Sequence, residues 1–332
     1  MQEEKRIKKF EQQLKQPKID MEKLRKIAWN GIPQKKRAET WKVLLGYQPV
    51  TATRVKKEIQ MKRQEYREFV TQYYEQQGLE RTLNEQAVLV QIQKDVPRTH
   101  PAPMFKQKQI CQSMERILYI SSLKQPACGY VQGHDTILTT FFTVFIAKEM
   151  NVQHVEHLLT ADPSFFEESL KKDVLMNVEA DAFYCLNTFL ADIQDFYTSD
   201  VPGIVRSLKR LEMLIGKVNP ALAKHMSRLQ EEGEGLHYMQ FAYRWINCLL
   251  LRELPLEVGV RLMDSYLAEG STFESLHINV CTAILDHFAE RLLQMDYFDV
   301  ITFFQRMPTM QWTISEMDTI LSQAFVYQHL YK

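Results

Sequence analysis

The segment KDVPRTHP, residues 94–101, carries one arginine between two prolines. Each proline lacks a backbone N–H and disfavours helical geometry in the residue before it. We therefore expect Val96 to be extended and Arg98 to lie on a constrained loop or short turn, preceded by Asp95. A guanidinium on a rigid loop can be presented to a phosphate at little ordering cost. The alternative is that Arg98 pairs with Asp95 or a carbonyl group and only fixes the loop.

A second segment, ACGYVQGHD at 127–135, places two glycines around a tyrosine and a glutamine. Gly129 and Gly133 permit unusual backbone dihedrals and close backbone approach around Tyr130 and Gln132. An amide held there could be presented to a polar group of another molecule. The alternative is a turn between two helices on which Gln132 is simply exposed.

The two segments together indicate more than either does alone. Arginine and glutamine are the side chains that accelerate GTP hydrolysis on small GTPases. The arginine neutralises charge that develops on the β- and γ-phosphates, and the glutamine orients the attacking water. Arg98 and Gln132 are therefore candidates for a catalytic pair that acts on a partner's nucleotide.

Self-contained active sites are absent from the sequence. There is no GxxxxGK[ST] loop, no HExxH, EF-hand or zinc spacing, and no GxSxG elbow. The GEG at 233–235 lacks a third glycine and a preceding strand. His154 and His157 have no third ligand candidate nearby, which favours surface histidines over a metal site. A catalytic role would have to be lent to another molecule's reaction, so the sequence leaves open whether the chain is itself an enzyme.

Three ordered motifs resemble the TBC domain, the Rab GTPase-activating family. They are GIPQKKRAETW at 31–41, IQKDVPR at 92–98 and YVQG at 130–133. The resemblance covers about residues 24–330 and is greatest to the TBC domain family member 22 group. It continues through four further segments: 191–204, 239–256, 261–270 and 307–312.

The resemblance implies a GTPase-activating protein for a GTP-bound Rab, which regulates vesicle trafficking. Arg98 would be the arginine finger and Gln132 the glutamine finger, in place of the Rab's own glutamine. Asp95 would orient the first finger loop, and Tyr130, Gly129 and Gly133 would support the second. No cofactor would belong to this chain, because Mg²⁺ and GTP come with the partner. The alternatives are a catalytically silent Rab-binding scaffold and, from outside the family, a generic α-helical adaptor.

The run after the second finger departs from the family pattern. The family continues with a GINDL-like run, whereas this chain has GHDTI, so His134, Asp135 and Thr136 differ. Met263 stands where the member 22 group tends to have tryptophan. The first departure lies beside Gln132 and could alter finger placement or Rab preference.

The elements that must position these residues are predicted to be helices, because apolar residues recur at helical spacing and no period-2 strand series occurs. The resemblance implies an all-α, two-lobed TBC fold. We expect a polar N-terminal arm at 1–26 and a TBC domain at 27–330, with lobes at about 27–198 and 199–330. The predicted helices lie at 33–46, 54–78, 105–124, 136–150, 174–197, 204–218, 237–253, 256–268, 276–294, 296–306 and 315–330, with a loop at 231–235.

The composition limits partners and location. The 332 residues include 41 basic and 41 acidic side chains, which gives no global attraction to nucleic acid or anionic membrane. Five dispersed cysteines favour reduced thiols and a cytoplasmic location. The apolar run at 136–147 is too short to span a bilayer and suits a buried helix. A peripheral site on endomembranes stays open through basic residues of helix 54–78, which otherwise form a solvated face: Lys56, Lys57, Lys62, Arg63 and Arg67.

Overall fold

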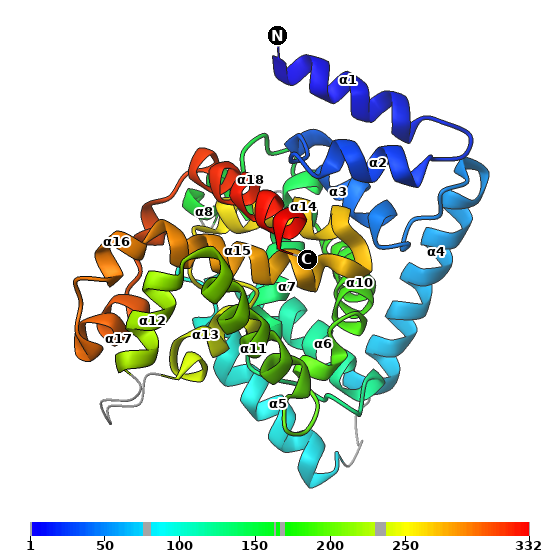
Figure 1. The fold of residues 1–332 in the computed structure, drawn as a ribbon. Helices are drawn as coiled ribbons and strands as arrows, with labels where there is room; N and C mark the ends of the chain where they lie inside the picture. Colours follow the sequence, from blue (N-terminus) through cyan, green and yellow to red (C-terminus); the bar gives the residue numbers. More distant parts are fainter. Residues whose placement is uncertain (1, 76–80, 163, 167–169, 230–236, 332) are drawn as a thin grey trace. The chain divides into compact units, whose positions relative to one another are not determined.

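The computed structural model describes residues 2–75, 81–162, 164–166, 170–229 and 237–331. These residues form helices and turns (Figure 1). Their only extended pairing is an isolated bridge between Lys18 and Thr51. The predicted all-α fold is confirmed. The predicted loop at 231–235 and the helix stop at Gly78 lie outside the described residues. None of the described helices has the length and apolar character needed to span a membrane.

The chain divides into two compact units, Met1–Asp192 and Ile193–Lys332. The first unit contains both segments that the resemblance identifies as finger motifs, 92–98 and 130–133. Its helices are α1 (Gln2–Leu14), α2 (Met21–Ala28), α3 (Gln34–Leu44), α4 (Ala52–Phe69), α5 (Leu83–Asp95), α6 (Lys108–Lys124), α7 (His134–Glu149), α8 (Val155–Thr160) and α10 (Lys172–Ala191). A π-helical segment, Val70–Glu75, extends α4, and 3₁₀ turns lie at Val96–Arg98 and Pro103–Lys106.

Helix α7 forms the centre of the first unit. Fourteen of its sixteen residues are buried, and it packs against α3, α6, α8 and α10. Two of its threonines satisfy their buried hydroxyls by bonding back to the preceding turn: Thr139 donates to Asp135 O at 2.8 Å and Thr143 to Thr139 O at 2.7 Å. Each buried phenylalanine of this helix contributes about 1.5–3 kcal/mol. The predicted buried helix is therefore confirmed, and its first turn is held firmly where the second finger motif ends.

The second unit is built around α15 (Phe273–His287), which packs against α11, α14 and α18. Its other helices are α11 (Pro202–Val218), α12 (Pro220–Leu229), α13 (Tyr238–Asn247), α14 (Leu256–Glu269), α16 (Ala289–Leu292), α17 (Tyr297–Gln305) and α18 (Ile314–Leu330). Short 3₁₀ turns lie at Gln194–Phe196, Gly270–Thr272 and Pro308–Gln311. Met263, one of the departures from the family pattern, is fully buried in α14.

Among the described helices, α5 and α12 were not predicted. Helix α5 matters most, because it ends at Asp95 and so carries the first finger motif. Its start has a clear local signal in the sequence TLNE. The Thr82 hydroxyl accepts from the Glu85 N–H, and the Glu85 carboxylate accepts from the Thr82 N–H at 2.7 Å. This capping box satisfies two N–H groups at the helix start.

Candidate functional site

Arg98 lies on a single 3₁₀ turn, Val96–Arg98, that follows α5 without a break. The predicted short turn is confirmed, but the prediction that Val96 is extended is wrong. Val96 has φ −52° and ψ −49°, and its N–H donates to Ile92 O. Pro97 is tolerated because it begins a new turn, where its missing N–H is not needed. Val96 is also fully buried, and this burial outweighs the steric preference imposed by the proline.

Asp95 gathers three side chains around one carboxylate. Gln91 Nε2 donates to both carboxylate oxygens at 3.1 and 3.0 Å, and the Tyr130 hydroxyl donates to Oδ2 at 2.9 Å. Arg98 donates to Oδ1 through Nε at 3.1 Å and through Nη2. Asp95 therefore links the turn that carries Arg98 to Tyr130 of the second motif.

The two members of the Arg98–Asp95 pair differ sharply in exposure. The Arg98 side chain is 63% exposed, whereas that of Asp95 is 1% exposed. The predicted alternative, a pair between them, is thus present. It engages only one edge of the guanidinium, through Nε and Nη2, so Nη1 lies on the opposite edge. Arg98 is held at its base and still presented outward, which makes the two interpretations of this residue compatible.

The second motif forms the turn between α6 and α7. Gly129 has φ +62°, and no atom lies within 4 Å of the position a Cβ would take. The glycine is therefore needed for its dihedral and not for space. Gly133 has φ +122° and caps the start of α7. Gln132 is exposed on this turn, between Tyr130 and the glycine that begins the helix.

The residues that depart from the family pattern are all buried. His134, Asp135 and Thr136 form the first turn of α7 and are 5–8% exposed. Asp135 Oδ1 accepts from the Gly133 N–H at 2.9 Å, and Oδ2 accepts from the Thr99 hydroxyl at 2.7 Å. Sequence reasoning did not identify Thr99 or Gln91 as site residues. Gln91 lies one helical turn before Asp95, so its role could have been read from the spacing once α5 was recognised.

Hydrogen bonds and burial set the protonation states of Asp95 and Tyr130. Burial raises the pKa of Asp95, but hydrogen bonds from Gln91, Arg98 and Tyr130 outweigh it and leave that pKa below its ordinary 3.8. Burial and the carboxylates of Asp135 and Asp95 raise the pKa of Tyr130. At neutral pH Asp95 is therefore an anion, and the Tyr130 hydroxyl keeps the proton that it donates.

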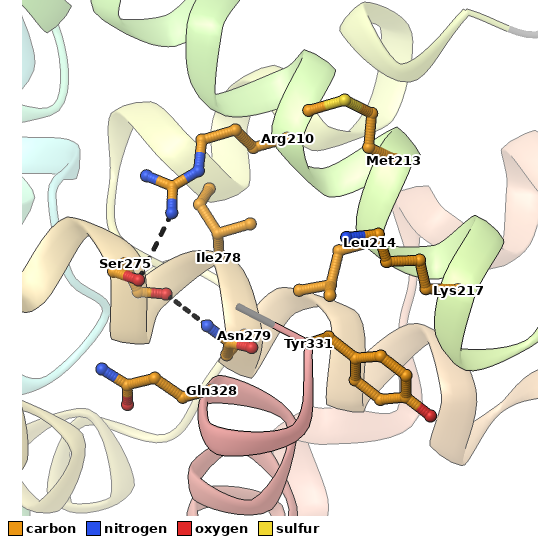
Figure 2. A pocket seen from close by; sticks show the side chains of 9 residues that line it. All are labelled: Arg210, Met213, Leu214, Lys217, Ser275, Ile278, Asn279, Gln328 and Tyr331. Atoms are coloured by element: carbon orange, nitrogen blue, oxygen red, sulfur yellow. Dashed lines mark hydrogen bonds between the residues drawn. The ribbon is translucent and has the colours of Figure 1, made fainter.

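A cavity of about 370 Å³ lies in the second unit, between α11, α15 and α18. Figure 2 shows Arg210 reaching toward Ser275, and Asn279 bonded to the Ser275 carbonyl within the same helix. None of the finger-motif residues lines this cavity. The candidate site in the first unit is thus an exposed pair of loops, which suits a macromolecular partner better than an enclosed small ligand.

The basic residues predicted as a surface on helix 54–78 are partly used inside the first unit. Arg63 pairs with Asp181, and Arg67 donates to Asn177 at 3.0 Å. Lys62 donates to Tyr47 O at 3.1 Å and lies over the Tyr47 ring. Two of the five predicted residues, Lys56 and Lys57, are exposed. This leaves little of the basic patch for a membrane or an acidic partner.

Comparisons with known proteins agree with the resemblance seen in the motifs. Residues 34–293 match the Rab-GTPase-TBC domain. The chain is 37% identical to human TBC1 domain family member 22B, over 99% of its own length and 62% of that protein. It is 38% identical to the GTPase-activating protein gyp1 of Schizosaccharomyces pombe, over 98% of the chain and 61% of the relative. The chain thus spans about three fifths of the length of these relatives.

The solved structures agree on the fold. The crystal structure of the Ypt/Rab-GAP domain of Gyp1p superposes with a TM-score of 0.91 at 36% identity, and the match covers 99% of both chains. A flagellar RabGAP TBC domain from Chlamydomonas has a TM-score of 0.61 at 20% identity, over 91% of this chain and 83% of that one, which bears on the fold alone. The chain belongs to the Rab-GTPase-TBC domain family.

Proposed function

We propose that this protein is a GTPase-activating protein for a GTP-bound Rab. The observation that carries the proposal is the arrangement around Asp95. This buried carboxylate bonds both to exposed Arg98 and to Tyr130 of the loop that bears exposed Gln132. Two similar proteins named GTPase-activating proteins, from Schizosaccharomyces pombe and Saccharomyces cerevisiae, support the same activity.

Arg98 would act on the phosphates of the bound GTP. Its guanidinium is fixed along one edge by Asp95, and its remaining nitrogen can donate to phosphate oxygens as negative charge develops on them. Prior anchoring lowers the ordering cost of presenting a long, flexible side chain. An arginine supplied in trans accelerates hydrolysis about 10³–10⁵-fold.

Gln132 would orient the attacking water through its side-chain amide. Its place directly before Gly133, the cap of α7, ties it to a buried helix. The partner would bring both GTP and Mg²⁺, so the chain needs no cofactor of its own. Such an activity implies a role in vesicle trafficking, in the cytoplasm and at the surfaces of endomembranes.

The test is single-turnover GTP hydrolysis across a panel of GTP-loaded Rabs. We expect wild type to accelerate at least one of them. Arg98→Ala should lower that rate about 10³-fold or more, and Gln132→Ala about 10²-fold, since both groups act mainly in the transition state. Lys57→Ala is the matched control, because this exposed lysine of α4 lies outside the motifs.

Two results would contradict the proposal. Stable binding of a GTP-loaded Rab without acceleration by wild type would instead identify a silent Rab-binding scaffold. Equal acceleration by wild type and Arg98→Ala would remove the role assigned to Arg98.

A further inference from the structure

Asp135 contacts the residue that directly follows each finger. Its Oδ2 accepts from the hydroxyl of Thr99, next to Arg98, at 2.7 Å. Its Oδ1 accepts from the N–H of Gly133, next to Gln132, at 2.9 Å. Asp135 is 6% exposed and belongs to the first turn of buried helix α7. One buried group therefore bridges the two loops, although Asp135 lies 36 residues after Thr99 in sequence.

Each contact fixes the backbone beside a finger. The Gln132–Gly133 peptide is planar, so holding the Gly133 N–H also orients the Gln132 carbonyl and limits rotation at Gln132. Gly133 has φ +122°, a conformation that glycine adopts readily and could leave as readily. On the other side, Thr99 closes the 3₁₀ turn, and its N–H donates to Val96 O at 3.3 Å. Its hydroxyl bond to Asp135 ties the end of that turn to α7.

The two buried carboxylates thus hold different parts of the site. Asp95 binds the side chains of Arg98 and Tyr130, whereas Asp135 binds the Gly133 backbone and the residue after Arg98. We propose that Asp135 is a positioning residue that sets the spacing between the two finger loops, through Thr99 and Gly133. This inference rests on the proposed function, since the spacing matters for two groups that act on one nucleotide.

The hydrogen count at Thr99 predicts which substitutions preserve the link. Its hydroxyl has one hydrogen and two acceptors in reach, Asp135 Oδ2 at 2.7 Å and Asp95 O at 3.1 Å. An asparagine at 135 would still accept from Gly133, and its amide nitrogen would donate to the Thr99 oxygen. The hydroxyl hydrogen would then go to Asp95 O. Asp135→Asn should therefore retain the link, whereas Asp135→Ala and Thr99→Val remove it.

The experiment combines turnover with a measurement on the free protein. For the Rab that wild type accelerates, Asp135→Ala and Thr99→Val should each lower kcat about 10- to 100-fold with KM within about twofold. Asp135→Asn and Thr99→Ser should stay within about threefold of wild type. The double variant Thr99→Val/Asp135→Ala should be little worse than Asp135→Ala, because both changes break one link.

Hydrogen exchange of the Gly133 amide, followed by NMR, reports the Asp135–Gly133 half of the link without any GTPase. We expect faster exchange at Gly133 in Asp135→Ala and wild-type protection in Asp135→Asn, with exchange in the rest of α7 unchanged. Faster exchange throughout α7 would mean that Asp135→Ala unfolds the helix. Thr99→Val, whose change lies outside α7, then decides the role through its kcat.

The outcomes separate this inference from the proposed function. Wild-type kcat in Asp135→Ala or Thr99→Val, or equal loss of kcat in Asp135→Asn and Asp135→Ala, would overturn the role of Asp135 while the GTPase-activating function stands. A wild-type protein that accelerates no Rab would remove the proposed function and with it the positioning role of Asp135 in that reaction. In that case the exchange at Gly133 would still show whether Asp135 holds the Gly133 backbone.

Discussion

The first unit contains two buried aspartates that bind arginine, and they are built differently. Asp181 accepts from Lys42 at 2.6 Å, from Tyr47 at 2.7 Å and from both Nε and Nη2 of Arg63 at 2.9 and 2.8 Å. These partners come from α3, α4 and the turn after α3, so the cluster ties those elements to α10. The Arg63 side chain is 24% exposed, against 63% for Arg98 on Asp95.

The difference separates two uses of the same ion pair. At Asp181 a bidentate arginine and a lysine neutralise a carboxylate between packed helices, and their other contacts are internal. At Asp95 the carboxylate is as buried, but its arginine is three residues away on an exposed turn. The exposed Arg98, which is paired along only one edge, is a candidate for contact with another molecule. The largely buried Arg63 instead stabilises the fold.

Removal of the Asp181 carboxylate should have the largest effect on stability. Asp181→Ala leaves Lys42 and Arg63 without their buried partner and should lower the free energy of unfolding by about 3–5 kcal/mol. Arg98→Ala removes an exposed side chain and should lower it by less than about 1 kcal/mol. Urea unfolding at pH 7, with hydrogen exchange of amides in α7 as the reporter for the first unit, measures both.

The effect on the rate of GTP hydrolysis should be larger for Arg98→Ala than for Asp181→Ala, the reverse of the order for stability. Asp181→Ala, assayed where it is folded, should accelerate GTP hydrolysis like wild type, while Arg98→Ala should not. The comparison would fail if Arg98→Ala destabilised the first unit as much as Asp181→Ala, because Arg98 would then be a structural cation as well.

The pH dependence of stability caused by His134 tests whether the first turn of α7 excludes water as a protein core does. Burial lowers the pKa of His134 from 6.5 to about 4. Between these values the unfolded chain takes up a proton that the folded chain does not, so the free energy of unfolding decreases as pH falls from about 6.5 to 4. For this residue the decrease should reach about 2–3 kcal/mol at pH 4.5 relative to pH 7.5.

His134→Leu should remove that part of the pH dependence, measured as native-state hydrogen exchange of α7 at the two pH values. Other buried histidines, such as His277 with a pKa lowered to about 3, remain in both proteins and cancel in the difference. An unchanged pH dependence in His134→Leu would mean that water reaches His134 and that the first turn of α7 is looser than its burial indicates.

Sequence patterns predicted the features that depend on residues close together in the chain. The apolar run at 136–147 predicted buried α7, and two prolines predicted the short turn at Arg98. Asp95 and Arg98 lie three positions apart, and a pair between them was one of the two predicted alternatives for Arg98. Helix α5 was missed because its apolar residues do not form a clear stripe, although its capping box at 82–85 marked the start.

Contacts between distant segments could not be read in the same way. Arg63 was assigned to a basic surface, yet it binds Asp181, 118 residues away. Asp135 was noted only as a departure from the family pattern, and its partner Thr99 lies 36 residues earlier. Neither pairing has a local signal, because the fold brings the partners together only after the helices pack. The prediction of an extended backbone at Val96 was wrong for a related reason. The burial of its side chain within the first unit outweighed the backbone preference set by Pro97.

The smallest expected effect on stability is that of Asp95→Asn, and it should depend on pH. Asp95 and Asp181 both have a pKa below 3.8, so each contributes stability that is fully present above about pH 5 and is lost as pH falls through its folded pKa. Asp95→Asn should cost about 1 kcal/mol at pH 7. The gap from wild type should close as pH falls through the folded pKa of Asp95, which lies below 3.8, because the wild-type carboxylate is then protonated as well.

The measurement is the free energy of unfolding of the first unit against pH for wild type and Asp95→Asn. In Asp95→Asn the amide oxygen can still accept from Gln91 and Arg98, and the amide nitrogen can donate to the Tyr130 oxygen, which is why the expected cost is small. A loss at pH 7 as large as that of Asp181→Ala would show that the Arg98 pair stabilises the fold as strongly as the buried cluster does. The exposure of Arg98 would then no longer distinguish a site that meets a partner from one that holds helices together.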